Sequence, residues 1–159
     1  MNIVVQKNIG AVVAFARAGA ASTATAGGTG DATAVVGGWI DREAIGANYA
    51  GGSLPLSAAF GLAYTATLAA GKSLSAALLV EDSADGSTPN TYLSVPAAVI
   101  ASSAAGGTVT GVGNFSVQLG SARRYVRFTW TPDLNATSVD TASLFPMLVF
   151  GGFDRLPTA

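Results

Sequence analysis

The sequence contains no cysteine and no histidine, and only 11% of its 159 residues are charged. Without these two residue types the chain has no disulfide, no Cys–His or Ser–His nucleophile system, and no metal site built from thiolates and imidazoles. Eight basic and nine acidic residues leave a net charge of -1, so the chain also lacks the positive field that binding to a phosphate backbone requires. We therefore expect no enzymatic activity, no cofactor, no metal and no nucleic-acid partner.

Long apolar runs are also missing. No run of 18 or more strongly apolar residues occurs, and the closest, Leu56–Gly71, is rich in Ala, Gly and Thr and is followed by Lys72. The N-terminal region resembles a signal peptide in having Lys7 before a short apolar run at 9–15, but Arg17 interrupts the pattern. We expect neither a membrane span nor export.

Small residues are abundant instead. The chain has 31 Ala, 20 Gly and 29 Ser plus Thr, which together make up about half of it. An alanine removes little apolar area from water, so the main core formers are Val, Leu, Ile and the 13 aromatic residues. A thin core with few charges predicts that neighbouring chains supply part of the stability.

Apolar residues recur at every second position, which is typical of β-strands. Large and small residues alternate over 59–68, and the alternation resumes over 74–80 after four residues that include glycine. We predict an antiparallel hairpin from this pair. A second hairpin is predicted from 115–119 and 126–130, joined by a turn at 120–122.

Further strands are predicted on both sides of the second hairpin. A short strand at Thr91–Val95 is ended by Pro96, and a closing strand covers Ser143–Phe150. Pro146 within the closing strand predicts a bulge or an edge position, because proline cannot donate to the ladder.

The chain as a whole predicts an all-β fold. Seven to nine short strands with turns every 8–12 residues or so favour an antiparallel β-sandwich of the jelly-roll type with a flexible N-terminal segment. We expect residues 1–159 to form a single β-sandwich domain. Within it, 1–32 form an extended arm and a mobile loop, and 33–159 form the sandwich core. The loop is expected at Ala18–Asp31, which has no large apolar residue to anchor it.

One segment matches a phosphate-binding loop in letters alone. Residues 66–73 read ATLAAGKS, but a phosphate loop needs glycines in its interior and must open a helix. This segment has Thr-Leu-Ala-Ala inside and lies between two predicted strands. We interpret it as a hairpin turn that carries a solvated lysine, Lys72.

A second segment resembles a calcium loop. Residues 81–86 read EDSADG, but the position that should hold the terminal glutamate holds Tyr92. We interpret the segment as a hairpin or crossover loop in which Asp-Gly supplies the left-handed position. Calcium binding shared with a neighbouring subunit is the alternative.

Acidic pairs that could serve acid–base catalysis are few. Asp41 with Glu43, and Asp133 with Asp140, lie beside turn signals, and nothing in the sequence fixes a separation between them. We interpret all four as solvated loop acids. The many serines and threonines have only two lysines as amine bases, so a nucleophile has little to activate it.

Two patterns indicate contact with other proteins. Residues 37–42 (GGWIDR) are echoed by 151–155 (GGFDR), either by coincidence in a Gly-rich chain or as two neighbouring strand ends that meet another chain. Arg123, Arg124 and Arg127 hold three of the six arginines, which favours a solvated strand face or docking onto an acidic protein surface over DNA. The candidate interface residues are Trp39, Arg42, Arg123, Arg127, Phe153 and Arg155.

From Tyr64 onward the chain resembles small jelly-roll cementing or decoration proteins on the heads of tailed bacteriophages. The resemblance is carried by 74–92 (LSAALLVEDSADGSTPNTY) and by 122–152 (ARRYVRFTWTPDLNATSVDTASLFPMLVFGG). The first is similar to a strand that enters a Ser-Asp-Gly loop. The second is similar to the Arg-Tyr-aromatic strand, polar loop and hydrophobic closing strand of such proteins.

This resemblance implies a virion structural protein without catalysis, made in the host bacterial cytoplasm and placed on the capsid exterior. Its partners would be the major capsid protein, whose subunits it would bridge, and further copies of itself, as a dimer or trimer. Two alternatives remain open: a minor tail, baseplate or tail-tube protein, and a carbohydrate-binding β-sandwich module. The carbohydrate module would use Trp39, Tyr49 and Tyr92 as its aromatic surface.

Overall fold

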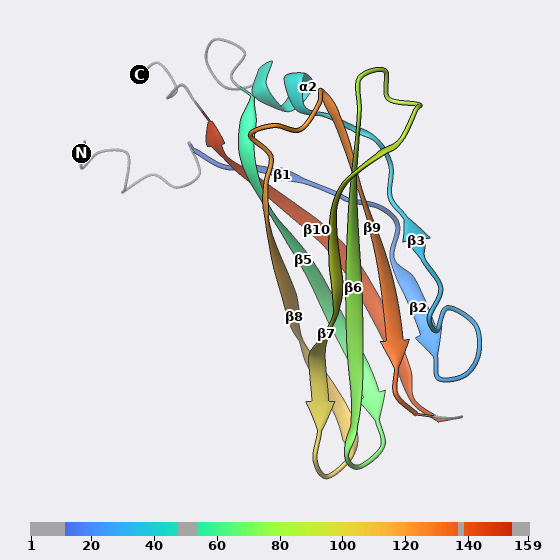
Figure 1. The fold of residues 1–159 in the computed structure, drawn as a ribbon. Helices are drawn as coiled ribbons and strands as arrows, with labels where there is room; N and C mark the ends of the chain where they lie inside the picture. The colour runs from blue at the N-terminus through green and yellow to red at the C-terminus, as the bar shows by residue number, and fades with distance from the viewer. Residues whose placement is uncertain (1–11, 48–53, 137–138, 154–159) are drawn as a thin grey trace.

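The computed structural model describes residues 12–47, 54–136 and 139–153 (Figure 1). Ten strands and one short helix occupy these residues, and no helix among them is long and apolar enough to cross a membrane. The elements are β1 (Ala14–Ala16), β2 (Ser22–Thr25), β3 (Val35–Val36), β4 (Ile40–Asp41), α2 (Arg42–Ala47), β5 (Pro55–Leu68), β6 (Lys72–Ser83), β7 (Asn90–Ser103), β8 (Gly107–Gln118), β9 (Tyr125–Leu134) and β10 (Thr141–Phe153).

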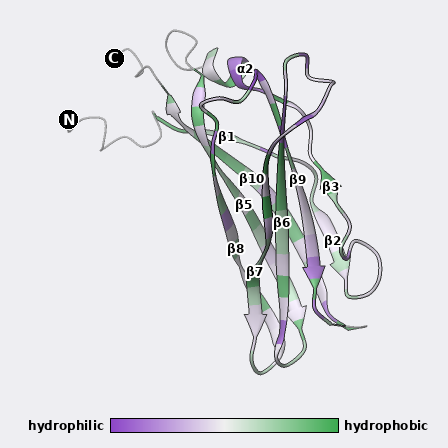
Figure 2. Cartoon of the chain, in the orientation of Figure 1, coloured by the Kyte–Doolittle hydropathy of each residue, from purple (hydrophilic) through white to green (hydrophobic). Residues whose placement is uncertain are grey.

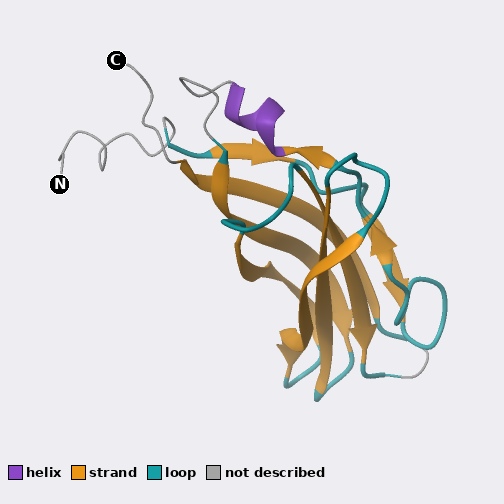
Figure 3. Cartoon of the chain, turned by 45° about the horizontal axis from the view of Figure 1, so that its top comes forward, coloured by secondary structure: helices purple, strands orange, loops and turns teal. Residues whose placement is uncertain are grey.

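The strands form two antiparallel sheets that face each other, with α2 at one end of the sandwich (Figure 3). In sheet A, β10 and β5 lie side by side, β8 follows β5, and β1 and β2 share the edge position beside β10. In sheet B, β9, β6 and β7 follow one another, and β3 and β4 share the edge beside β9.

The connectivity is that of a jelly roll. When β1 with β2 and β3 with β4 are each counted as one interrupted strand, eight strands remain, four in each sheet. Numbered along the chain, they lie in the order 1-8-3-6 in sheet A and 2-7-4-5 in sheet B. This is the interleaved double Greek key of a jelly roll, so the predicted fold class is confirmed.

Both predicted hairpins are wrong. β5 and β6 lie in different sheets, and so do β8 and β9, so each of these connections carries the chain from one sheet to the other. Alternation shows only that a strand buries one face, and two strands facing each other across a core bury that face just as two paired strands do. The pair that forms a hairpin is β6 and β7, with Asp82 opposite Asn90, so the loop interpretation of 81–86 is confirmed.

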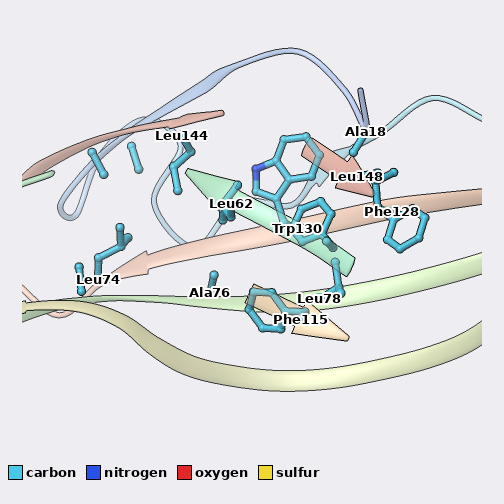
Figure 4. Packing of buried hydrophobic residues seen from close by; sticks show 14 of the residues in the cluster. Ala18, Leu62, Leu74, Ala76, Leu78, Phe115, Phe128, Trp130, Leu144 and Leu148 are labelled. Carbon is cyan, nitrogen blue, oxygen red and sulfur yellow. The ribbon is translucent and has the colours of Figure 1, made fainter. Parts of the chain in front are cut away.

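The core fills the space between the sheets (Figure 4). Phe60 of β5 stacks on Phe128 of β9 with ring centroids 5.8 Å apart, and it also lies 5.9 Å from the ring of Trp130. All three side chains are fully buried. Since Phe60 belongs to sheet A and the other two to sheet B, this aromatic cluster ties the two layers together.

The expectation of a mobile loop at Ala18–Asp31 is wrong. β2 lies inside this segment and pairs with β10, and Ala18, Ala24 and Ala26 are buried. The anchors are backbone pairing and the Asp31 carboxylate, which accepts from the N–H groups of Gly27 (2.7 Å) and Leu134 (2.8 Å). Residues 1–11 lie outside the described part of the chain, so the division into 1–32 and 33–159 stays a prediction.

The two strand prolines both follow from strand position. β7 does not end at Pro96 as predicted but continues to Ser103, because it is an edge strand whose register with β6 shifts between Ala76 and Leu78. Pro146 pairs with Leu62 on one side. On its other side it falls between the stretches of β10 that β1 and β2 cover, so Pro146 has no described strand beside it there, although β10 itself lies inside sheet A.

Candidate functional site

The strands of sheet A hold no charged residue, and the charged side chain at the outer face, Arg17, follows β1 at the edge of the sheet. None of the residues of β1, β2, β5, β8 and β10 is Asp, Glu, Lys or Arg. In Figure 2 the hydrophilic colour lies on α2, on parts of sheet B and its loops, and on part of β8. Soluble monomers rarely expose a large contiguous apolar patch, and such patches mark interaction sites.

Large apolar side chains stand on this face as a band, which we call the apolar band. Val112, Ala63 and Phe145 form one cross-strand row, and Asn114, Gly61 and Met147 form the next. The exposed fractions of the large members are 77% for Phe15, 54% for Val112, 50% for Phe145 and 46% for Met147. These exposures are high for side chains that would normally be buried.

A shallow hollow of about 470 Å³ lies where β10 has neither β1 nor β2 beside it. Its lining is almost entirely apolar, with a single charged residue, Arg17, whose Nε donates to the Gly19 carbonyl at 2.7 Å. The hollow is formed by Phe15, Ala16, Arg17, Ala21, Phe145, Pro146 and Met147. Because it is open and without other ionisable groups, it suits packing against protein better than chemistry on a small substrate.

The end of the sandwich near α2 has the opposite character. Arg124 forms ion pairs with Asp41 (2.6 Å) and Glu43 (2.8 Å), and its guanidinium lies 5.1 Å from the Tyr125 ring. The hydrogen bond from Arg124 is the main cause that lowers the pKa of the Asp41 carboxyl, and the same bond raises the pKa of Arg124. Asp41 also accepts from the N–H of Glu43 at 3.0 Å, which caps α2.

Two of the predicted interface residues meet at this end. The Arg127 guanidinium lies 4.7 Å from the centre of the Trp39 ring and forms an ion pair of 2.6 Å with Glu81. The hydrogen bond from Arg127 to Glu81 raises the pKa of Arg127. Trp39 and Arg127 are both partly buried, so they form a fixed, charged aromatic surface on sheet B.

Arg42 does not lie on the surface as predicted. It is 1% exposed, and its guanidinium donates to the carbonyls of Pro55 (2.7 Å), Leu119 (2.8 Å), Arg123 (3.0 Å) and Ala122. Burial is the main cause that lowers its pKa. The expectation that Arg42 contacts a partner is therefore corrected: it joins the first residue of α2 to the start of β5 and to the chain between β8 and β9.

The other predicted interface residues differ in their surroundings. Arg123 is exposed, while its backbone N–H donates to the Asp82 carboxylate at 2.9 Å. Phe153 is partly buried, packs against the core and pairs with Pro55. Arg155 lies outside the described residues.

The echoed GGWIDR and GGFDR segments meet indirectly, because Arg42 binds the carbonyl of Pro55, the residue that pairs with Phe153. Gly37 in the first segment is required by space: a Cβ there would lie 2.3 Å from the Ala18 carbonyl oxygen and 2.5 Å from that of Phe128.

Sequence reasoning missed the apolar band and Arg124. The band could have been found in the closing strand, where LFPMLVF has apolar residues at both the inward and the outward positions. Arg124 was one of three neighbouring arginines, and only the fold shows that it is the one facing Asp41.

In the acidic loop between β6 and β7, the carboxylate of Asp85 accepts hydrogen bonds from neighbouring residues of the loop. Asp85 accepts from the N–H groups of Thr88 (2.9 Å) and Ser87 (2.8 Å) and from the Ser83 hydroxyl (2.7 Å). These bonds, with Thr88 first, hold the pKa of Asp85 well below its usual range. Gly86 has φ +73°, the left-handed position expected of Asp-Gly. Within the described residues no group of three or more potential metal ligands occurs.

Two further interpretations are settled by the same geometry. The segment 66–73 turns from β5 into β6 through Gly71 (φ +72°) and opens no helix, so the phosphate-loop reading is excluded. Asp140, expected to be a solvated loop acid, is 1% exposed, and its carboxylate accepts from the Ala69 N–H at 2.9 Å. It is a structural acid that ties the loop before β10 to the loop after β5.

No family model matches the sequence, and no curated protein matches it. Twenty-two chains of solved structures do. One is from the crystal structure of the T13 particle of infectious bursal disease virus, with 10% identity and a TM-score of 0.46 over 87% of this chain and 30% of that chain.

Two other chains give similar values. The structure of the Gx strain of that virus has 11% identity and a TM-score of 0.43 over 91% of this chain and 34% of that chain. The PBSX exported protein XepA has 20% identity and a TM-score of 0.39 over 89% of this chain and 40% of that chain. This chain thus spans between 30% and 40% of the length of these structures. At these identities and TM-scores the likeness bears on neither function nor partners.

Proposed function

We propose that this chain is a non-enzymatic structural protein of a bacteriophage virion, one that decorates the capsid exterior and bridges major capsid subunits. The observation that carries the role in an assembly is the outer face of sheet A, whose strands hold no charged residue and which bears large exposed apolar side chains. A face of this kind is stable when another protein covers it, as in an assembly.

The chemistry of the described residues supports a structural role. Several of their charged side chains are held in ion pairs or in hydrogen bonds to backbone groups, as at Arg124, Arg42 and Asp85. The hollow on sheet A has no acid or base beside it other than Arg17. An arrangement of this kind stabilises a fold and its contacts and offers no nucleophile or general base.

The end near α2 is the part that we assign to the capsid. Arg123 is exposed there, and Trp39 with Arg127 forms a fixed aromatic and charged surface nearby on sheet B. Arginine and tryptophan are typical anchors of protein interfaces. Arg155 is included in this proposal from its sequence position.

The alternative of a carbohydrate-binding module requires free aromatic rings. The Tyr92 hydroxyl donates to the Gln118 carbonyl at 2.8 Å, and the Trp39 ring is faced by the Arg127 guanidinium. Both rings are thus engaged within the chain, and Tyr49 lies outside the described residues. A tail or baseplate role differs from the capsid role only in location.

The test is to produce virions with and without this chain and to measure the temperature at which their heads release DNA. We expect heads without the chain to release DNA at a lower temperature, and added purified chain to restore the higher one. A chain carrying Arg123→Ala should bind more weakly and restore less. Heads that withstand heat equally well with and without the chain, or gold label found on tails in micrographs, would contradict the proposal.

A further inference from the structure

We propose that the outer face of sheet A is the contact surface between two copies of this chain, packed face to face about a two-fold axis. The inference deepens the proposed function and rests on it, because it names the partner that covers this face. The end near α2 stays free in such a pair, so a dimer would present two capsid-binding ends and could bridge two subunits.

The absence of charge favours a second copy as the partner. A two-fold interface sets each patch against the same patch of the other subunit, so any charge near the axis meets its own copy. The strands of sheet A hold no charged residue, and the charged side chain beside them, Arg17, follows β1 at the edge of the sheet, away from an axis between β5 and β10. A different partner would be selected by complementary charges, and the strands of this face offer none.

The relief of the face is self-complementary. On β5 the outward residues are small, namely Ala59, Gly61 and Ala63, while the neighbouring positions on β10 hold Phe145 and Met147. The small side chains along β5 thus lie directly beside the bulky side chains along β10. A two-fold axis parallel to the strands and between β5 and β10 places the bulky side chains of each copy over the small side chains of the other.

Gly61 supports this arrangement because the single chain does not require a glycine there. A Cβ at Gly61 would lie 3.5 Å from a Val112 methyl and 3.9 Å from the Met147 methyl, which is ordinary contact. No left-handed backbone explains the residue either, since Gly61 is not among the positions of positive φ. Glycine weakens a strand interior unless another group approaches closely. A second copy supplies that group.

The face has the area that a stable dimer needs. β5 pairs with β8 from Ser57 to Leu68 and with β10 over nearly the same rows. With about 3.3 Å per residue and about 4.8 Å per strand, twelve rows of β5, β8 and β10 together with the short strands β1 and β2 give a face of about 700 Å². A stable interface of standard size covers about 800 Å² on each partner.

The test compares one substitution on the two sheets. Val112 on β8 and Val99 on β7 each lie on the outermost strand of their sheet, and they are 54% and 64% exposed. Val112→Lys places a charge within the proposed interface, whereas Val99→Lys places it on the outer face of sheet B. Sedimentation velocity from about 1 to 100 μM should show a dimer that dissociates on dilution, with a dissociation constant raised at least about tenfold by Val112→Lys and unchanged by Val99→Lys.

A second variant separates association from folding. Gly61→Val replaces one of the small residues along β5 with a residue that suits a strand, so the melting temperature of the monomer should hold or rise while the dissociation constant rises about tenfold. A wild-type chain that stays monomeric at every concentration, or equal weakening by Val112→Lys and Val99→Lys, overturns the inference.

The two proposals fail separately. A monomer that still decorates heads would overturn the dimer and leave the capsid role standing. A dimer that never binds heads would overturn the capsid role and leave the dimer standing.

Discussion

The two sheets share one core but have unlike outer faces. The outer face of sheet A exposes the apolar band, and its strands hold no charged residue, whereas the strands of sheet B carry the Arg127–Glu81 ion pair, Lys72 and Asp133. Their inward faces are alike, and Phe60 of sheet A stacks directly on Phe128 of sheet B. Stability of the single chain therefore does not account for the difference between the outer faces.

The difference assigns separate tasks to the two sides. On the side of sheet B and α2, the charges of Arg42, Arg124 and Arg127 are fixed by backbone and carboxylate partners and serve the fold. On the outer face of sheet A, the large apolar side chains are exposed to solvent in the single chain and are available for contact with another chain. Substitutions on the sheet B side should therefore change unfolding free energy and leave association intact, and substitutions on the outer face of sheet A should do the reverse.

The largest effect on stability is expected from Arg42. Arg42→Ala leaves the carbonyls of Pro55 and Leu119, among others, without their donor, and should lower the unfolding free energy by about 3–5 kcal/mol. Arg124→Ala, which removes the solvent-screened ion pairs with Asp41 and Glu43 at the same end, should lower it by much less. Urea unfolding followed by tryptophan fluorescence measures both, and equal losses would show that Arg42 is not the structural link.

The next largest difference in unfolding free energy is expected between substitutions at two glycines, Gly37 and Gly61. Gly37→Ala forces a Cβ against the carbonyl oxygens of Ala18 and Phe128 and should cost about 2–3 kcal/mol. Gly61→Ala meets only ordinary contacts and should raise the unfolding free energy by up to about 0.5–1 kcal/mol. Thermal unfolding of the two variants below the dimer dissociation constant gives the ranking. A loss at Gly61 as large as that at Gly37 would remove the argument that the monomer does not need Gly61.

A smaller effect is expected at the ion pair of sheet B. Glu81→Gln removes the carboxylate that Arg127 binds at 2.6 Å, where the side chains are 22% exposed for Arg127 and 13% for Glu81, and should cost about 1 kcal/mol. Glu43→Gln, at a 54% exposed side chain, should cost about 0–0.5 kcal/mol. Neither variant should change the sedimentation of the chain. A shift toward monomer in Glu81→Gln would place part of the interface on sheet B.

The smallest effect is a pH dependence in the loop between β6 and β7. The folded chain holds the pKa of Asp85 below its ordinary value of 3.8, so the carboxylate contributes stability that is present above that pH. This stability is lost as the pH falls below 3.8 toward the folded value. Asp85→Asn should therefore unfold more readily than the wild type at pH 7, and the gap should narrow on acidification. A gap that is constant with pH would mean that the amide replaces the carboxylate fully.

The sequence was most informative where periodicity and backbone chemistry act locally. Alternation located the strand that holds Phe60, and the Asp-Gly signal located the β6–β7 turn with Gly86 in the left-handed region. It could not tell a hairpin from a crossing between sheets, because the two connections bury the same face of each strand. It also placed Arg42 among surface anchors, since the four carbonyls that it binds come together only in the folded chain.

The apolar band was hidden for a related reason. Phe145 and Met147 alternate with buried Leu144, Pro146 and Leu148, so the closing strand reads as hydrophobic throughout and does not show which face is covered. Phe145 and Met147 point outward because β10 lies inside sheet A, between β5 and the edge strands, with its other face on the core. The position of β10 depends on the topology of the whole chain.

The central claim is that protein covers the outer face of sheet A when the chain is assembled. The most direct test is the rate at which peroxide oxidises Met147, which is 46% exposed in the single chain. Mass spectrometry measures this rate at increasing protein concentration. The rate should fall as the dimer forms and should rise again in Val112→Lys but not in Val99→Lys. A Met147 that is oxidised equally fast in dilute and concentrated chain, and in intact virions, would contradict the claim.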